Sequence, residues 1–385
     1  MTRRVLFILA NSEMTAGANR SLRDWLKNRD RNQLVPYILM PRENAYTRKA
    51  YEEIGCTVWV GHYLFNVKHI GNCAFSLKIK DYVKKYISVI CNPITRFFLG
   101  FKIRQERIDI IHSNSFSTTY GARLALRNSL PHIWHIREFM GEDHGHALID
   151  SPAKVKKLCA YSYAIYISDI VKAVFERKYS FRKSTVIINQ IEYDSSYTKK
   201  RLFMEDGTCK IMIAGSIDPG KGQREAIQAV KLLKLEGYPV DLYICGTGDL
   251  SLIADLISDE TSSYIHLLGF CEKLTEVRKE MDIALICSRM EAFGRVTVEA
   301  LYYMNYVIAA NTGCTKNIIR DGENGQLYRL GDVSQLASKI RNIIIKHDGI
   351  EDSLSKSSFE AVDRYSGDIY SKICSVYDWM EKNGK

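Results

Sequence analysis

Two glutamates eight positions apart, Glu291 and Glu299, bracket the segment EAFGRVTVE. The preceding run MDIALIC (281–287) is short and apolar, which predicts a buried strand. Glu291 should therefore lie on the loop that leaves this strand, and Glu299 should lie within the helix that follows. Because open α/β sheets bind ligands at the carboxyl ends of their strands, we expect both carboxylates at a ligand site.

Glu299 is the more informative of the two glutamates. Most glutamates on helices lie on a solvated face, but Val296, Val298 and the run ALYY (300–303) leave this helix little polar surface. A carboxylate buried in such a helix is costly unless hydrogen bonds satisfy it. Hydroxyl groups of a ligand would supply those bonds, which favours a binding role over a solvated one.

Length and composition bound the class of protein. The chain has 385 residues, 46% hydrophobic and 25% charged, which is enough for two or three globular domains. Its ten cysteines lack paired or metal-type spacing, as is typical of a reduced, cytoplasmic protein. The first apolar run, VLFILA (5–10), is too short for the core of a signal peptide, and no other stretch approaches the roughly 18 apolar residues of a membrane span. We expect a cytoplasmic protein, peripheral at the inner face of the membrane.

The formal net charge of +10 suits nucleic acid, an anionic membrane surface or phosphorylated substrates. No nucleic-acid-binding motif is present, so nucleic acid is not an expected partner. Residues 68–107 hold nine Lys or Arg against two acids, among bulky apolar side chains. This composition indicates either a solvated basic helix or a patch that binds an anionic membrane surface. Helical spacing gathers Tyr82, Tyr86 and Ile90 on one side. The lysines near them are Lys78, Lys80, Lys84 and Lys85.

Short apolar strands and amphipathic helices alternate in both halves of the chain. This pattern predicts parallel sheets covered by helices on both faces, in two doubly wound α/β domains. The polar stretch 191–208 is the expected linker. The expected strands are 5–10, 35–40, 57–60, 108–113, 131–136, 164–168 and 184–188 in the first half, and 209–215, 240–246, 264–269, 282–287 and 306–310 in the second.

Glycine-rich turns follow the first strand of each half. In the first half, Gly17 opens a helix and lets the backbone approach a ligand. In the second half, GSIDPGKGQ places Lys221 at a helix expected to begin near Lys221–Gly222. Free amides, the helix dipole and the ammonium group favour an anion there, although a plain turn with a surface lysine would have the same sequence. The later GTGDLS (246–251) lacks the third glycine of a dinucleotide fingerprint and follows the second strand, so it does not predict dinucleotide binding.

Together these motifs resemble the retaining family-four glycosyltransferases of the GT-B fold. The resemblance rests on the order and spacing of GSIDPGKGQ, ICGTGD, LGF, EAFGRVTVEA and NTGCTKNIIRDGENGQLY, of which EAFGRVTVE is similar to the E-x7-E signature. In the first half, TAGANRSL resembles the glycine loop, HIREF the histidine-bearing strand end and VIINQ the strand before the interdomain crossing. The resemblance implies an N-terminal, acceptor-side Rossmann-like domain (1–195) and a C-terminal, nucleotide-sugar-binding Rossmann-like domain (206–365) that face a central cleft. A C-terminal helix (366–385) is expected to cross back to the first domain.

The resemblance also implies roles for individual residues. Glu291 would contact the reacting end of the donor sugar, and His135 would lie beside that sugar from the other domain, as the catalytic candidates. Lys221 would neutralise the leaving diphosphate, Glu299 would accept hydrogen bonds from the ribose, and Phe270 would lie near the base. The remaining candidates for donor binding are Gly17, Ser216, Phe293, Gly294, Arg295 and Val296.

Three positions depart from the family's pattern. Ser216 stands where many members have arginine, Asn317 where glutamate is frequent, and Gln190 where glycine usually follows Asn189. These departures leave the two glutamates intact and bear on the identity of the donor.

The sequence therefore predicts a retaining hexosyltransferase that uses a nucleotide diphosphate sugar, UDP-linked, as its donor. The acceptor would be a hydroxyl of a cell-surface glycan, lipid-linked sugar or wall polymer. No D-x-D motif occurs, and the expected phosphate contacts are amides and cations, so we expect no metal and no other cofactor. One alternative is a glycosidase, which needs two carboxyl groups about 5–9 Å apart. Another is a non-catalytic GT-B subunit that binds a partner enzyme or a glycan.

Overall fold

The structure is a computed structural model that describes residues 2–14, 16–64, 67–70, 75–191, 197, 202–347 and 349–383, without the side chains of residues 75–78, 80, 84 and 144. Two compact units divide the chain. The first is formed by Met1–Gln190 together with Asp368–Lys385, and the second by Ile191–Gly367. Half of the stretch 191–208, expected as a linker, lies outside the described residues.

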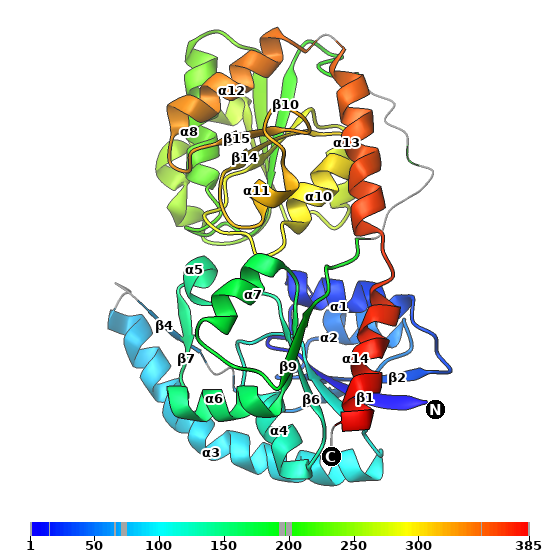
Figure 1. The fold of residues 1–385 in the computed structure, drawn as a ribbon. Helices are drawn as coiled ribbons and strands as arrows, with labels where there is room; N and C mark the ends of the chain where they lie inside the picture. Colours follow the sequence, from blue (N-terminus) through cyan, green and yellow to red (C-terminus); the bar gives the residue numbers. More distant parts are fainter. Residues whose placement is uncertain are drawn as a thin grey trace. The chain divides into compact units, whose positions relative to one another are not determined.

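The first unit contains a seven-stranded parallel sheet in the order β3-β2-β1-β5-β6-β8-β9 (Figure 1). Each strand corresponds to an expected one, because parallel strands buried on both faces read as apolar runs. A short antiparallel ribbon of β4 and β7 was not predicted. The strands are β1 (Arg3–Ile8), β2 (Leu34–Met40), β3 (Thr57–Val60), β4 (Val67–His69), β5 (Ile110–Ser113), β6 (His132–Ile136), β7 (His146–Leu148), β8 (Tyr163–Tyr166) and β9 (Lys183–Val186). The helices are α1 (Gly17–Lys27), α2 (Ala45–Glu52), α3 (Phe75–Gln105), α4 (Tyr120–Asn128), α5 (Gly141–His144), α6 (Pro152–Tyr161), α7 (Asp169–Glu176) and α14 (Ile369–Asn383).

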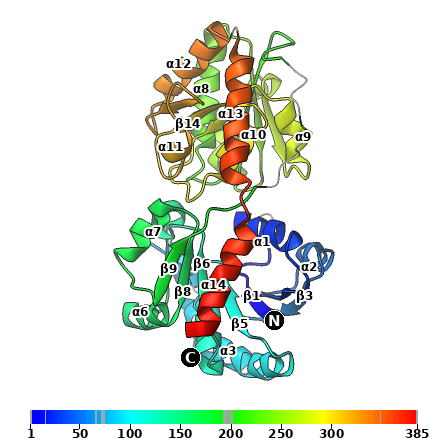
Figure 2. The same ribbon diagram turned by 45° about the vertical axis from the view of Figure 1, so that its right-hand side comes forward.

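The last helix, α14, packs on the first sheet as the resemblance implied. Its buried side chains Ile373, Tyr377 and Met380 join the core that contains Phe7 of β1. Both views show α14 beside α1 (Figures 1 and 2). The first unit is therefore built from the two ends of the chain.

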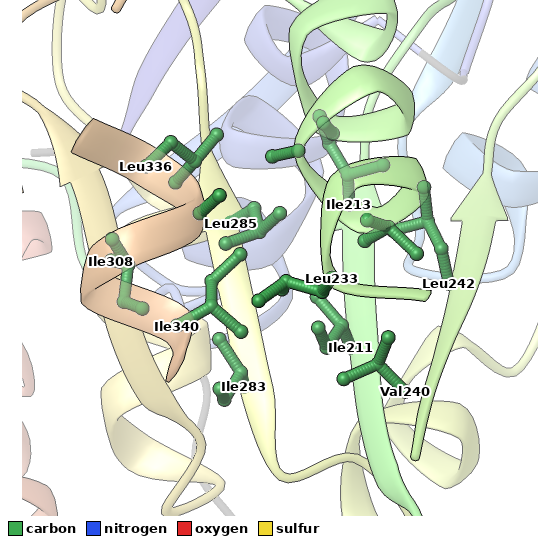
Figure 3. Packing of buried hydrophobic residues seen from close by; sticks show 14 of the residues in the cluster. Ile211, Ile213, Leu233, Val240, Leu242, Ile283, Leu285, Ile308, Leu336 and Ile340 are labelled. Carbon is green, nitrogen blue, oxygen red and sulfur yellow. The ribbon is translucent and has the colours of Figure 1, made fainter. Parts of the chain in front are cut away.

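The second unit contains a six-stranded parallel sheet in the order β12-β11-β10-β13-β14-β15. Residues at alternate positions of its strands pack against α8 and α12 to form the core in Figure 3. The strands are β10 (Cys209–Ala214), β11 (Val240–Cys245), β12 (Ile265–Gly269), β13 (Ile283–Ile286), β14 (Tyr306–Ala310) and β15 (Gln326–Tyr328), of which β15 was not predicted. The helices are α8 (Gln223–Leu235), α9 (Leu274–Lys279), α10 (Arg295–Tyr302), α11 (Thr315–Ile318), α12 (Val333–Ile345) and α13 (Ile350–Tyr365), with short 3-10 turns at Leu250–Leu252, Ala254–Leu256 and Thr261–Ser263.

Candidate active site

The glutamates of EAFGRVTVE lie on the elements that the sequence predicts. Glu291 lies in the loop after β13, and Glu299 lies within α10. Gly294 precedes the helix with a φ of 82°, a conformation that glycine adopts at low cost. A Cβ on Gly294 would lie 2.7 Å from Cδ1 of Ile318, so this tight turn has no room for a side chain.

The glycine-rich turn after β10 brings Lys221 to Glu291. Helix α8 begins at Gln223, one residue beyond the predicted start, and Gly222 precedes it with a φ of 75°. A Cβ on Gly222 would lie 2.4 Å from the carbonyl oxygen of Cys287, which follows β13. This close backbone approach sets the turn against the loop of Glu291, and Lys221 Nζ lies 2.6 Å from Glu291 Oε1. The phosphate turn and the first glutamate thus belong to one site.

The segment GTGDLS supports this turn through backbone packing. A Cβ on Gly246 would lie 1.9 Å from the carbonyl oxygen of Gly215, and one on Gly248 would lie 2.2 Å from that of Ile217. Ile217 and Gly248 also form an isolated parallel bridge. Both glycines therefore allow the loop after β11 to lie directly against the turn that carries Lys221.

Arginines hold both carboxylate oxygens of Glu299. Arg278 Nη2 donates to Oε2 at 2.9 Å, and Arg295 Nε donates to Oε1 at 2.7 Å. The side chain of Arg278 is 1% exposed and that of Glu299 is 13% exposed, so each charge depends on the other for compensation. Contrary to the sequence argument, no ligand is needed to satisfy this carboxylate. The contact with ribose hydroxyls stays a prediction.

The N-terminus of α10 offers an anion-binding surface. The amides of the first turn have no acceptors within the helix, and the positive end of its dipole lies there. Phe293 is buried edge-on against Tyr365, with ring centroids 5.8 Å apart, while Arg295 and Val296 are half-buried. Two cations, Lys221 and Arg295, thus belong to the two motifs that meet at this site.

The other candidates for donor binding are Ser216, Phe270 and Gly17. Ser216 is exposed in the phosphate turn, where its hydroxyl donates to Asp218 Oδ2 at 2.8 Å. Phe270 follows the edge strand β12 and is 55% exposed. Gly17 begins α1 in the first unit, and no atom of the described chain comes within 4 Å of the Cβ position there.

The second catalytic candidate, His135, lies fully buried near the carboxyl end of β6. Burial and the neighbouring guanidinium of Arg137 hold the pKa of His135 well below its usual value, so the imidazole is neutral. Arg137 itself is fixed by two amide oxygens. Its Nε donates to Asn114 Oδ1 at 2.8 Å and its Nη1 donates to Asn189 Oδ1 at 2.7 Å.

The contacts of His135 determine which ring nitrogen carries the proton. Arg137 Nη2 lies 3.3 Å from His135 Nδ1, and a guanidinium can only donate, so Nδ1 accepts. His112 Nε2 also lies 3.3 Å from this Nδ1, and it must therefore carry a proton. His112 Nδ1 is then the acceptor for the hydroxyl of Tyr377 at 2.9 Å. In this arrangement the proton of His135 sits on Nε2, a buried atom that finds no hydrogen-bond partner among the described residues.

Sequence reasoning missed Arg278 and Tyr377. Arg278 lies in α9 among other charged residues, and no local signal distinguishes it from a surface arginine. Tyr377 lies 265 residues from His112 along the chain, so the contact depends on the packing of α14. The sequence indicated only that Asn189 lies near the end of a strand. In the structure its side chain accepts a hydrogen bond from the guanidinium of Arg137.

Comparison with known proteins gives a family match within the second half of the chain. Residues 197–356 match the family model described as Glycosyl transferases group 1, and they include both the phosphate turn and EAFGRVTVE. This segment is therefore similar to the group 1 glycosyl transferases. The match to the group 1 glycosyl transferases confirms the resemblance on which the sequence prediction rested.

Relatives of this chain include "Putative glycosyltransferase EpsD" of Bacillus subtilis (strain 168). It is 27% identical over 195 residues, which are 48% of this chain and 50% of EpsD. The "Phosphatidyl-myo-inositol mannosyltransferase" of Mycolicibacterium smegmatis is 23% identical over 186 residues, 47% of this chain and 48% of that protein. The chain thus spans about half the length of these relatives.

The likeness to solved structures extends over the whole chain. Anabaena Alr3699/HepE, solved in complex with UDP and glucose, gives a TM-score of 0.75 at 18% sequence identity, over 98% of this chain and 99% of that one. At this identity the likeness establishes the fold. The predicted GT-B fold, with two Rossmann-like units and a C-terminal helix on the first, is confirmed.

Proposed function

We propose that the chain is a retaining glycosyltransferase that moves a hexose from a UDP-linked sugar to a hydroxyl of a cell-surface glycan, lipid-linked sugar or wall polymer. The observation that carries this proposal is the 2.6 Å contact between Lys221 and Glu291, which joins a phosphate-type turn to the E-x7-E segment. The complex of HepE with UDP and glucose supports a UDP-linked donor. The name of the mycobacterial relative, which includes a phosphatidylinositol, supports a lipid-linked acceptor.

The arrangement suits the departure of a diphosphate. The first-turn amides of α10, Lys221 and Arg295 provide donors and positive charge whose positions are set before the reaction. In the structure, Lys221 is paired with Glu291. A diphosphate would compete for the ammonium group and release Glu291 Oε1 to accept hydrogen bonds from the sugar.

His135 is assigned the role of a neutral donor. Its Nε2–H would donate to an oxygen of the sugar, and its low pKa keeps it from carrying a charge beside the Arg137 guanidinium. The step that deprotonates the acceptor is taken from the family resemblance, in which the leaving phosphate removes the proton on the face that it departs from.

We also propose peripheral attachment at the inner face of the membrane. Tyr82 and Tyr86 lie side by side on α3, with ring centroids 4.7 Å apart, and are 61% and 53% exposed. Ile87 and Ile90 are 47% and 65% exposed on the same helix. Of the helices that the structure describes, none combines the length and apolarity that crossing a membrane requires. Among the lysines expected to contribute, Lys85 is exposed, and the side chains of Lys78, Lys80 and Lys84 lie outside the described residues.

Two measurements test the donor assignment. Calorimetric titration with UDP should give binding that Lys221→Ala weakens by at least about tenfold, the value of one charge-assisted hydrogen bond. A panel of nucleotide hexoses, followed by release of free nucleotide without acceptor, should then identify one hydrolysed donor. Absence of binding to every nucleotide would refute the donor site, and binding without any turnover would favour the non-catalytic subunit.

A further inference from the structure

A cationic cavity lies in the helical layer of the first unit, where α3, α4 and α6 meet. Its volume is about 380 Å³, which is within the range of small-molecule sites. None of its lining residues belongs to the proposed donor site. Five of them are cations: Arg96 of α3, Arg123 and Arg127 of α4, and Lys154 and Lys157 of α6.

The positive charge of this cavity is largely uncompensated. Asp150 pairs with Arg123 at 2.7 Å, and its other oxygen accepts a hydrogen bond from the hydroxyl of Thr119. Within the described part of the chain, the other four cations form no ion pair. Burial, together with the charges of Arg123 and Arg127, lowers the pKa of Arg96. Like charges held together in this way are costly, and a bound anion would offset that cost.

Two of the arginines are held in place by aromatic rings. Arg96 lies over the ring of Tyr120, 5.4 Å from its centroid, and Arg127 lies over the ring of Phe97 at 5.3 Å. Stacking restricts the planar guanidinium groups while their N–H edges remain able to donate. Restricted guanidinium groups with nearby ammonium groups suit phosphate, which accepts several charge-assisted hydrogen bonds at once.

An exposed aromatic cluster adjoins the cavity. Arg127 lies over the ring face of Phe97. The Phe97 ring packs edge-on against Phe98 and Phe101, and its centroid lies 5.7 Å from that of Phe98 and 5.0 Å from that of Phe101. These three rings are 46%, 66% and 53% exposed, and Leu126 of the cavity wall is 42% exposed. Contiguous apolar surface of this kind marks an interaction site, whereas single exposed apolar residues are common on any protein surface. Anionic and apolar groups of one ligand would therefore find complementary surfaces side by side.

The aromatic cluster continues an apolar face along α3. The exposed residues recur at helical steps of three and four, whereas Leu99 and Ile103 on the opposite side are buried in the core. The helix thus presents apolar groups to both the protein and its surroundings, which favours a lipid surface as the second partner. The exposed apolar residues of α3 are Ile79, Tyr82, Val83, Tyr86, Ile87, Val89, Ile90, Ile94, Phe97, Phe98 and Phe101.

We propose that the cavity binds the phosphate end of an anionic lipid, a phosphomonoester or diphosphate, while the aromatic cluster of Phe97, Phe98 and Phe101 contacts its apolar part. The inference deepens the membrane contact suggested under the proposed function and rests on it, but it does not depend on glycosyl transfer. A phosphomonoester carries up to two charges and three acceptor oxygens, so it matches this cavity better than a phosphodiester with one charge.

The test compares matched lysine variants of the full chain on defined vesicles. Phosphatidylcholine vesicles that contain phosphatidic acid, a phosphomonoester, are compared with vesicles that contain enough phosphatidylglycerol to give the same charge. The double variant Lys154→Ala/Lys157→Ala removes two lining cations, whereas Lys156→Ala removes an exposed lysine of the same helix that does not line the cavity. At about fivefold per cation near a lipid surface, the double variant should bind phosphatidic acid vesicles roughly 25-fold more weakly.

The expected result is a preference of the wild type for phosphatidic acid that the double variant loses and Lys156→Ala keeps. An equal loss per lysine removed in both variants, or no preference in the wild type, would indicate diffuse surface charge and overturn the proposal. Calorimetric binding of inorganic pyrophosphate that depends on Lys154 and Lys157, without any effect on vesicle binding, would assign the cavity to a free anion and also overturn it. Titration of the same proteins with UDP reports on the donor site separately, so that failure of the lipid site and failure of the proposed function remain distinguishable.

Discussion

The substitution Tyr377→Phe should lower turnover although Tyr377 lies on the last helix of the chain, outside every sequence motif. The change removes one hydroxyl and leaves the ring, so α14 keeps its packing against the first sheet. His112 Nδ1 then loses the donor that lies 2.9 Å away and has no need to remain an acceptor. The proton of His112 can move to Nδ1, and Nε2 can no longer donate to His135.

The magnitude follows from one buried hydrogen bond. A hydrogen bond of this kind contributes about 1 kcal/mol net, and a buried acceptor left unpaired costs about 1–3 kcal/mol. If the lost free energy comes from the interaction that orients His135 in the transition state, a loss of about 1.4 kcal/mol lowers kcat tenfold. The affinity for UDP should stay unchanged, because the proposed UDP ligands Lys221, Arg295 and Glu299 all belong to the second unit.

The assay is steady-state release of UDP from the donor, together with nitrogen-15 NMR of the histidine rings. The wild type should give the Nε2–H tautomer for both His112 and His135, and Tyr377→Phe should shift His112 toward Nδ1–H. Tyr370→Phe is the matched control, because Tyr370 lies on the same helix and packs against Trp25, 6.5 Å between ring centroids. Wild-type kcat with an unaltered tautomer pattern, or an equal loss in the control, would refute this chain of contacts.

Other predictions concern the carboxylates, the metal and the effect of pH. Glu291→Gln should lower kcat roughly 100-fold, as for other groups that act in the transition state, with little change in the Kd for UDP. If kcat and the affinity for UDP fell by similar factors, Glu291 would instead be a ligand of the nucleotide. Glu299→Gln leaves the buried Arg278 without its charge partner and should lower the free energy of unfolding by about 3 kcal/mol, and an unchanged urea midpoint would show that the pair contributes nothing. Turnover should be insensitive to EDTA, and recovery of lost activity with manganese or magnesium would contradict the amide-and-cation assignment. Burial lowers the pKa of His132 to about 3 from 6.5, so between these values the unfolded chain binds more protons than the folded one. The free energy of unfolding should therefore fall as pH decreases below about 6.5, by up to about 1.4 kcal/mol per pH unit for this residue, and an equally steep decline in His132→Gln would exclude His132 as the cause.

The sequence predicted the sheets better than it predicted the polar contacts. Strands such as β10 and β13 are apolar runs because both of their faces are covered, and that pattern is local. The strands β4, β7 and β15 span three residues each, too few to show a period. The sequence placed Lys221 and Glu291 after two separate strands, and the structure shows that these strands, β10 and β13, are parallel neighbours.

The partners of Glu299 could not be predicted in the same way. Burial of the carboxylate was inferred correctly from the apolar residues of α10, but its compensation by Arg278 depends on how α9 packs beside that helix. The tautomer of His135 likewise depends on Tyr377, which no local pattern connects to β6. Contacts between distant side chains are set by tertiary packing, and a single sequence does not encode them as periodicity or spacing.

Because α14 completes the first unit, that unit cannot be complete until the second unit has been synthesised. The ribosome releases the strands of the first sheet long before Ile373, Tyr377 and Met380 exist to cover the face around Phe7. The second unit is continuous in the chain and can finish folding while the first still exposes this apolar face. A chain truncated before α14 would keep the residues of the family match, but its first sheet would be uncovered and His112 would lack its donor. Chaperones and proteases that recognise exposed apolar surface would encounter the nascent chain during this interval.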